Sequence, residues 1–246
     1  MPSPLESMRI ATRRLTPLNI PFVFVGGAAI SVLVDRPDLT DFRPTKDVDV
    51  VVAVLTRAEF TKLEAGLRDL GFQHDMSEGA PICRWIVEGC KVDIMPQESE
   101  VLGMNSKWFA QVMAIAEPID LGDNCTAKVV TAALFLATKL EAFNDRGEAD
   151  YYGSKDLEDI VTLVHGRDAI VADVAASPVK EFVSLSFAAL LGNADFRDAI
   201  PGHLSVMYGA RQQVGRVWDR FQQIAGLENK REKKRTRFNL KTTDSD

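Results

Sequence analysis

A short run of alternating aspartate and valine constrains this chain more than any other feature. Residues 47–54 read DVDVVVAV, and their β-branched side chains favour a central strand. Side chains two apart on a strand point to the same face, so Asp47 and Asp49 project side by side. Two adjacent carboxylates repel each other unless a cation neutralises them, and oxygen ligands of this kind suit Mg²⁺. The strand therefore predicts a metal site.

A third carboxylate belongs to the same predicted site. Asp93 lies in the apolar run KVDIM (91–95), where an unpaired charge would be costly. Three carboxylates on neighbouring strands can hold two Mg²⁺ ions, one activating an attacking hydroxyl and one neutralising a triphosphate and the departing pyrophosphate. We expect Asp47, Asp49 and Asp93 to be both metal ligands and catalytic residues, and the chemistry to be in-line nucleotidyl transfer from an NTP.

Two glycines precede the acidic strand. Gly26 and Gly27 follow the apolar run FVFV (22–25), a predicted short buried strand, and precede a short helix predicted over 28–35. At such a junction glycine lets backbone amides approach phosphate oxygens, and the helix presents its positive N-terminus to them. A glycine pair also marks ordinary tight turns. One loop before the acidic strand, we interpret it as a cradle for the triphosphate.

The remaining pattern divides the chain into a half with strands and a helical half. Further strands are expected around 83–89, 91–95 and 128–130. Helices are expected over 5–16, 56–71, 106–116 and 131–147, and near 154–165, 178–191 and 203–226. The sequence thus predicts an α+β fold, in which a β-sheet with flanking helices is followed by a C-terminal helical bundle.

Three segments are expected along the chain. They are a catalytic domain at 1–130, a helical domain at 131–228 and a basic, disordered tail at 229–246. Within the tail, NKREKKRTRFNLK (229–241) carries seven Lys or Arg and one acid, whereas the whole chain has a net charge of −6. Such a tail can attract a polyanion such as RNA, or it is simply a solvated terminus.

Several classes of protein are excluded by composition. No apolar stretch approaches the roughly 18 residues that a membrane-spanning helix needs, and the N-terminus lacks the apolar core of a secretion signal. We therefore expect a cytoplasmic protein without a membrane partner. The three cysteines show no CxxC spacing and the three histidines lie far apart, so buried thiols are expected rather than a zinc site.

The order of these motifs resembles a known superfamily. VGGAAI (25–30), TKDVDVVV (45–52) and KVDIM (91–95) are similar to the Gly-Gly or Gly-Ser turn, Asp-x-Asp strand and later single Asp of the nucleotidyltransferase superfamily typified by DNA polymerase β. The resemblance implies a mixed β-sheet of that type, Mg²⁺ as cofactor and an NTP as substrate. This chain has Ala28 where a Ser or Thr is usual, and its loop before the acidic strand is longer than in the minimal motif.

The helical half resembles one branch of that superfamily. KVVTAALFLATKLEAFNDRG (128–147) and SKDLEDIVTLV (154–164) are similar to the AbiEii-like branch, the toxins of bacterial type IV toxin–antitoxin pairs and their relatives. The resemblance implies nucleotide-site roles for Lys139, Arg146, Lys155 and Asp156, with Asp159 one turn beyond.

The charged residues of the helical half can also be interpreted from their physical chemistry alone. A lysine within an apolar helix face is costly unless it meets an anion, and for Lys139 a triphosphate is one such anion. For Asp156 and Asp159, the alternative is a salt bridge that pins the helical half to the catalytic sheet.

Two residues directly before the acidic strand complete the set of predicted nucleotide-site residues. Relatives often carry a small hydroxyl residue before the Lys-Asp of the metal strand, so the resemblance implies nucleotide contacts for Thr45 and Lys46. Capping of the loop is the alternative for Thr45.

These motifs together predict a metal-dependent nucleotidyltransferase that moves an NMP from an NTP to an acceptor. The acceptor classes left open are RNA or tRNA, a protein and a small molecule. The AbiEii-like resemblance implies a toxin with a cognate antitoxin. The alternative is a non-catalytic nucleotide-binding or scaffold protein with the same fold, but the presence of all three carboxylates favours an enzyme.

Overall fold

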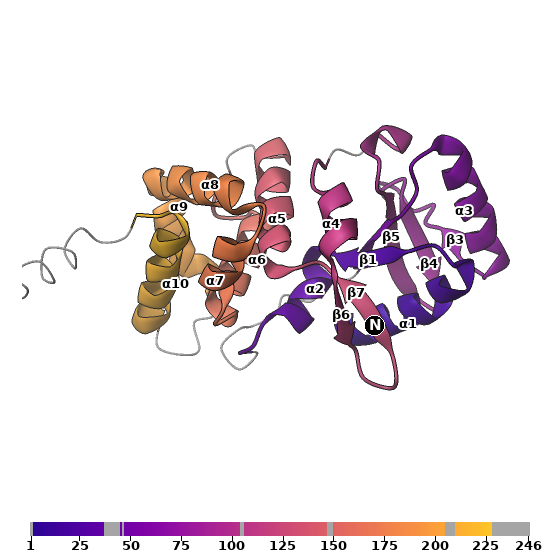
Figure 1. Ribbon diagram of the computed structural model, residues 1–246, viewed down its shortest axis with the longest axis horizontal. Helices are drawn as coiled ribbons and strands as arrows, with labels where there is room; N and C mark the ends of the chain where they lie inside the picture. Colours follow the sequence, from indigo (N-terminus) through magenta and orange to yellow (C-terminus); the bar gives the residue numbers. More distant parts are fainter. Residues whose placement is uncertain are drawn as a thin grey trace, which may run out of the picture.

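The computed structural model describes residues 2–36, 45, 47–103, 106–146, 150–204 and 210–227. Lys46 and the predicted tail at 229–246 lie outside the described residues. A region built around a β-sheet and a region of helices lie side by side in Figure 1, joined by α5 and α2. The predicted α+β fold class is confirmed.

The sheet region contains a mixed sheet of seven strands in the order β3-β4-β5-β2-β1-β7-β6. The pairs β2–β5 and β1–β7 are parallel, and the other pairs are antiparallel. The strands are β1 Phe22–Val25, β2 Asp47–Val52, β3 Gln73–His74, β4 Arg84–Val87, β5 Cys90–Pro96, β6 Glu117–Asp120 and β7 Thr126–Val129. The acidic strand β2 is central, since β5 and β1 flank it and its valines are buried.

A two-residue turn aligns β4 with β5. Glu88 and Gly89 both have positive φ, +49° and +76°, as the primed turns of tight hairpins require. This turn sets a register in which Arg84 pairs with Asp93, and Asp93 pairs on its other side with Asp49 of β2. The turn therefore decides which side chain of β4 stands beside the carboxylates.

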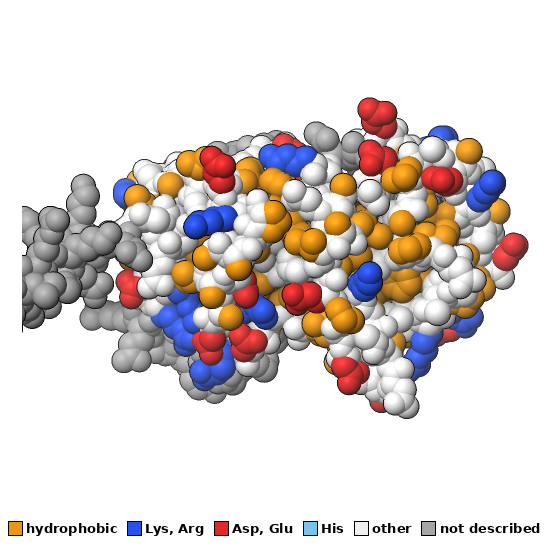
Figure 2. Space-filling view, in the orientation of Figure 1, with side chains coloured by type: hydrophobic (Ala, Val, Ile, Leu, Met, Phe, Trp, Pro, Cys, Tyr) orange, Lys and Arg blue, Asp and Glu red, His pale blue; other side chains and the backbone are white. Residues whose placement is uncertain are grey.

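Four helices pack around the sheet. They are α1 Pro4–Leu15, α2 Gly26–Leu33, α3 Arg57–Asp69 and α4 Phe109–Ile115, with 3₁₀ turns at Thr16–Leu18 and Ser99–Val101. α1 contacts β2 and β5, whereas α4 contacts β1 and β2. α3 begins with a capping box between Thr56 and Glu59. Figure 2 shows apolar side chains at the surface over α4 and β1, with charged side chains spread over both regions.

Among the described residues, the helical region contains six helices and a 3₁₀ turn at Ile200–His203. The helices are α5 Ala132–Arg146, α6 Lys155–Gly166, α7 Ile170–Ala176, α8 Lys180–Gly192, α9 Ala194–Ala199 and α10 Ala210–Ile224. α5 packs against α6, α7 and α8, and most of its side chains are buried. α2 contacts β1 and β2 on one side and α5 and α6 on the other, so it connects the two regions.

Most predicted elements form within a few residues of their expected bounds, and the differences have physical causes. The strand predicted over 47–54 ends at Val52. The short elements β3, β6, α7 and α9 were not predicted. β6 contains Pro118 and has mostly exposed side chains, so it lacks the alternation that marks a strand.

Two exclusions made from the sequence can be compared with the structure. No helix within the described ranges is both long and apolar enough to cross a membrane. Cys83, Cys90 and Cys125 are buried free thiols, as expected.

Replacing Gly89 by Ala should destabilise the β4–β5 hairpin. At φ +76° an L side chain costs about 1–2 kcal/mol, although nothing lies within 4 Å of the added Cβ. Urea denaturation should therefore give a free energy of unfolding lower by about 1 kcal/mol or more. Gly202→Ala is the matched control, because Gly202 has no positive φ and its Cβ also meets open space. Equal losses in the two variants would contradict the role of the turn.

Candidate active site

Four charged side chains lie together on one face of the sheet. The register places Asp93 of β5 between Asp49 of β2 and Arg84 of β4. Asp47 lies two residues before Asp49 and therefore projects from the same face. The structure thus brings the three predicted carboxylates together and adds an arginine that the sequence analysis did not assign. We call these four residues the acidic row.

Arg84 binds two of the three carboxylates. Its Nε donates to Asp93 Oδ1 and its Nη2 donates to Asp93 Oδ2, both at 2.7 Å. The same Nη2 also donates to Asp47 Oδ2. Only 17% of the Arg84 side chain is exposed, and its hydrogen bonds with Asp93 raise the pKa of the guanidinium. Arg84 is therefore a fixed positive charge between two carboxylates.

The third carboxylate, Asp49, is destabilised in its charged form. Burial, together with the charges of Asp93 and Asp47, raises the pKa of Asp49 to about 7, although the charges of Lys139 and Arg84 act in the opposite direction. At neutral pH without a metal, Asp49 is therefore partly protonated. This is the electrostatic signature of a carboxylate cluster that has room for more positive charge.

A glycine allows the backbone to approach Asp49 closely. Gly26 begins α2 directly after β1 and has φ +64°. A Cβ added at Gly26 would lie 1.9 Å from Asp49 Oδ2, a distance that no side chain tolerates. The predicted glycine turn therefore lies against the acidic row.

The helical region supplies a second charged cluster. Lys139 of α5 lies 2.5 Å from Asp159 Oδ2 and 3.2 Å from Asp156 Oδ1, and Arg146 Nη2 lies 2.8 Å from Asp156 Oδ2. Burial lowers the pKa of Lys139, but the charges of Asp159 and Asp156 outweigh it and raise the pKa. The anions beside Lys139 in the structure are therefore carboxylates.

The ion pairs of Asp156 and Asp159 bear on their second interpretation, a salt bridge that pins the helical half to the sheet. The ion pairs that both aspartates make with residues of α5 join α5 to α6 within the helical region.

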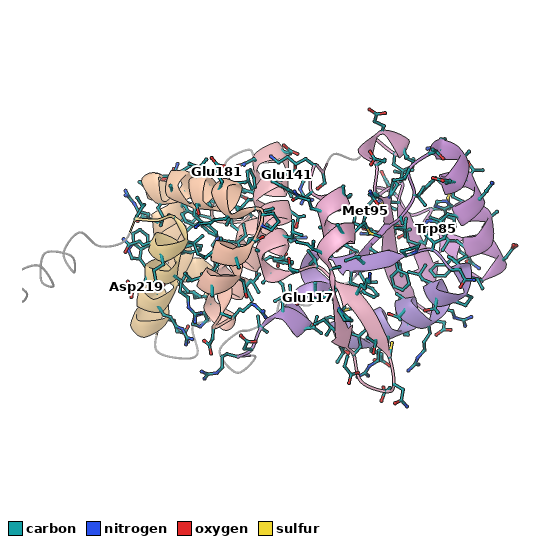
Figure 3. The ribbon with its side chains drawn as sticks, in the orientation of Figure 1. Trp85, Met95, Glu117, Glu141, Glu181 and Asp219 are labelled. Carbon is teal, nitrogen blue, oxygen red and sulfur yellow. The ribbon has the colours of Figure 1, made fainter. Side chains whose placement is uncertain are left out.

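A cleft of about 1030 Å³ separates the acidic row from the helical region. Its wall includes every described residue predicted for the site: Gly26, Gly27, Thr45, Asp47, Asp49, Asp93, Lys139, Arg146, Lys155 and Asp156. Figure 3 labels Met95 on the sheet side and Glu141 on the helical side, and both line this cleft. The structure therefore unites residues that are more than 100 positions apart in the chain.

Among the described residues, Arg84 is a charged partner of Asp47 and Asp93 that sequence reasoning missed. The sequence does contain a signal for this contact, because Glu88 and Gly89 can form a two-residue hairpin turn. Counting back from such a turn places Arg84 opposite Asp93.

The donor set matches a hard divalent cation, although its present arrangement does not hold one. In the described part of the chain, no three His, Cys, Asp or Glu side chains are placed so that they could hold a metal ion together. Three carboxylates facing one cleft nevertheless supply the oxygen ligands that Mg²⁺ prefers. Burial is the main cause of the raised pKa of Asp49, and the charges of Asp93 and Asp47 add to it.

Comparison with solved structures supports the fold assignment. An antigenic nucleotidyltransferase-like protein from Paracoccidioides brasiliensis superposes with a TM-score of 0.51 and 18% identity, over 82% of this chain and 94% of that one. The antibiotic-resistance factor ANT(2'')-Ia gives a TM-score of 0.46 and 14% identity, over 76% of this chain and 91% of its own. No family model and no curated protein sequence matches the chain. The fold is therefore nucleotidyltransferase-like.

Asp49→Asn should remove a pH dependence of stability. The pKa of Asp49 rises from 3.8 to about 7 on folding, so the folded protein binds the proton more tightly. Native stability therefore falls as the pH rises from about 4 to about 7, by at most about 4 kcal/mol.

Thermal unfolding in a chelating buffer tests this. At pH 5 the two proteins should have similar Tm values, since Asp49 is then neutral, whereas at pH 8 the variant should be the more stable. A Tm difference that is the same at both pH values would contradict the raised pKa.

Proposed function

We propose that this protein is a metal-dependent nucleotidyltransferase that moves an NMP from an NTP to an acceptor. The supporting observation is the acidic row, in which Asp47, Asp49 and Asp93 meet across β2 and β5 and face a large cleft. A fold hosts many functions, so the proposal rests on this site. Three carboxylates that face one cleft beside a glycine-led helix N-terminus suit the handling of a metal-bound triphosphate.

Asp47, Asp49 and Asp93 would hold Mg²⁺ in this proposal, with two ions expected. When bound, Mg²⁺ supplies Lewis-acid activation of the acceptor hydroxyl and neutralisation of the leaving pyrophosphate.

The chain's own residues bind and orient the two substrates. The backbone at Gly26 and Gly27 and the positive end of α2 face the phosphates, while Lys155 at the start of α6 adds a cation on the opposite wall. The acceptor hydroxyl gives its proton to a carboxylate oxygen of the acidic row. The oxygen of the acceptor then forms a bond to the α-phosphorus of the NTP, as the bond from that phosphorus to pyrophosphate breaks. The cleft brings these groups together and limits the access of water.

RNA is the acceptor that we propose, with the tRNA 3′ end as the first candidate. This finer proposal is supported by the resemblance of residues 128–147 and 154–164 to AbiEii-like toxins. It extends to a cognate antitoxin as partner. Three of the residues carried by that resemblance, Lys139, Arg146 and Asp156, form one ion-pair cluster on the cleft wall. Protein and small-molecule acceptors are the other outcomes of the test.

One observation favours the alternative of a non-catalytic nucleotide-binding protein. Arg84 already neutralises part of the charge of Asp47 and Asp93 without a metal. A protein that used this arrangement permanently would bind NTP weakly and would not turn it over.

Asp47→Ala should abolish transfer of labelled NMP. The purified protein is incubated with each α-labelled NTP, Mg²⁺, total cellular RNA and a protein fraction, and label is followed into RNA, protein and small molecules. Loss of a metal ligand should lower transfer and pyrophosphate release by about 100-fold or more.

Asp120→Asn is the matched control, because Asp120 belongs to the edge strand β6 and is absent from the lining of the cleft. It should retain the rate of the unmodified protein. If the unmodified protein releases no pyrophosphate from any NTP, the enzymatic proposal fails and the non-catalytic alternative gains support.

A further inference from the structure

Arg84 donates hydrogen bonds to carboxylate oxygens that a metal would need as ligands. Its guanidinium binds both oxygens of Asp93 and one oxygen of Asp47. A bidentate arginine–carboxylate pair is among the stronger hydrogen-bonded ion pairs. A metal that takes Asp47 and Asp93 as ligands must therefore displace this arginine or share its acceptors, and sharing brings two cations into close repulsion.

The neighbouring lysine gives a useful comparison. Lys91 also lines the cleft, and the register places it beside Asp47 on the next strand. Its Nζ nevertheless pairs with Asp75 Oδ2 at 3.0 Å, outside the acidic row. Arg84 and Lys91 thus line the same cleft but have different partners. Within the described part of the sheet, only Arg84 forms ion pairs with the expected metal ligands.

The charges in the cleft indicate where the guanidinium of Arg84 moves when it leaves Asp47 and Asp93. Lys139 forms its ion pairs with Asp159 and Asp156 on the helical side, and its charge also lowers the pKa of Asp49 in the acidic row. An incoming metal neutralises the carboxylates and repels Arg84. The metal-bound NTP brings phosphate oxygens into the same cleft, and a guanidinium binds phosphate with the same fork geometry as carboxylate.

We propose that Arg84 is an internal cation that holds Asp47 and Asp93 while no metal is bound, gives way to the metal when the metal-bound NTP enters, and then contacts the triphosphate. This inference deepens the proposed function and rests on its metal site. It assigns to one residue both the stability of the metal-free row and a part of nucleotide recognition.

Metal binding without nucleotide gives the direct test. Mn²⁺ affinity is measured by electron paramagnetic resonance for the unmodified protein, Arg84→Ala and Lys91→Ala. Removal of the competing guanidinium should tighten Mn²⁺ binding by about tenfold or more. Lys91→Ala removes the same charge from the same cleft without touching the acidic row, so its effect should stay within about threefold. Equal effects in the two variants, or weaker Mn²⁺ binding by Arg84→Ala, would overturn the proposal.

A second variant keeps the test decisive if Arg84→Ala does not fold. Arg84→Lys retains the charge but cannot donate two parallel hydrogen bonds to Asp93. It should bind Mn²⁺ several-fold more tightly than the unmodified protein. An unchanged or weaker affinity in this folded variant counts against the proposal.

Nucleotide binding should respond in the opposite direction. At saturating Mg²⁺, Arg84→Ala should bind a non-hydrolysable NTP analogue about tenfold more weakly, because the guanidinium contact with the triphosphate is lost. A purely structural arginine would weaken both metal and nucleotide binding.

The failure of this inference can be told apart from failure of the proposed function. Asp47→Ala should weaken Mn²⁺ binding in the same assay whatever Arg84 does. If it does not, the acidic row is not a metal site and the proposed function itself fails. If it does, while Arg84→Ala leaves Mn²⁺ affinity unchanged, only the role of Arg84 is wrong.

Discussion

Mutual repulsion among three carboxylates is the constraint on which the rest of the structure depends. Asp47, Asp49 and Asp93 are brought together by the parallel pairing of β2 with β5, and their charge must be compensated within a partly buried cleft. In the structure, Arg84 compensates two of them, and the third carries a raised pKa. We propose that this partly balanced site accepts a cation.

The surrounding elements serve to hold this unfavourable cluster in place. The β4–β5 hairpin turn supplies Arg84 at the correct register, and Gly26 lets α2 begin directly against Asp49. α2 also reaches α5 and α6, so the same helix that touches the acidic row ties it to the opposite wall. On that wall, the Lys139 cluster fixes α5 to α6 and defines the far side of the cleft. Local turn chemistry thus determines the geometry of a site assembled from distant segments.

The sequence predicted those parts of the structure that depend on local pattern. The alternation from Asp47 to Val52 was sufficient to predict a central strand and two side chains on one face. The partners of Lys139 depend on how two helices pack, so no local signal pointed to Asp159 rather than a phosphate. Arg84 required a strand register, which a two-residue turn fixes but hydrophobic alternation alone does not. β6 escaped prediction because Pro118 and exposed side chains hide its pairing.

A crystal structure with Mn²⁺ and a non-hydrolysable NTP analogue would test the central claim most directly. We expect anomalous density for Mn²⁺ bound by Asp47, Asp49 and Asp93, with the triphosphate between the acidic row and the start of α2. Anomalous density elsewhere, with Arg84 still bound to Asp93 and the nucleotide outside the cleft, would contradict it.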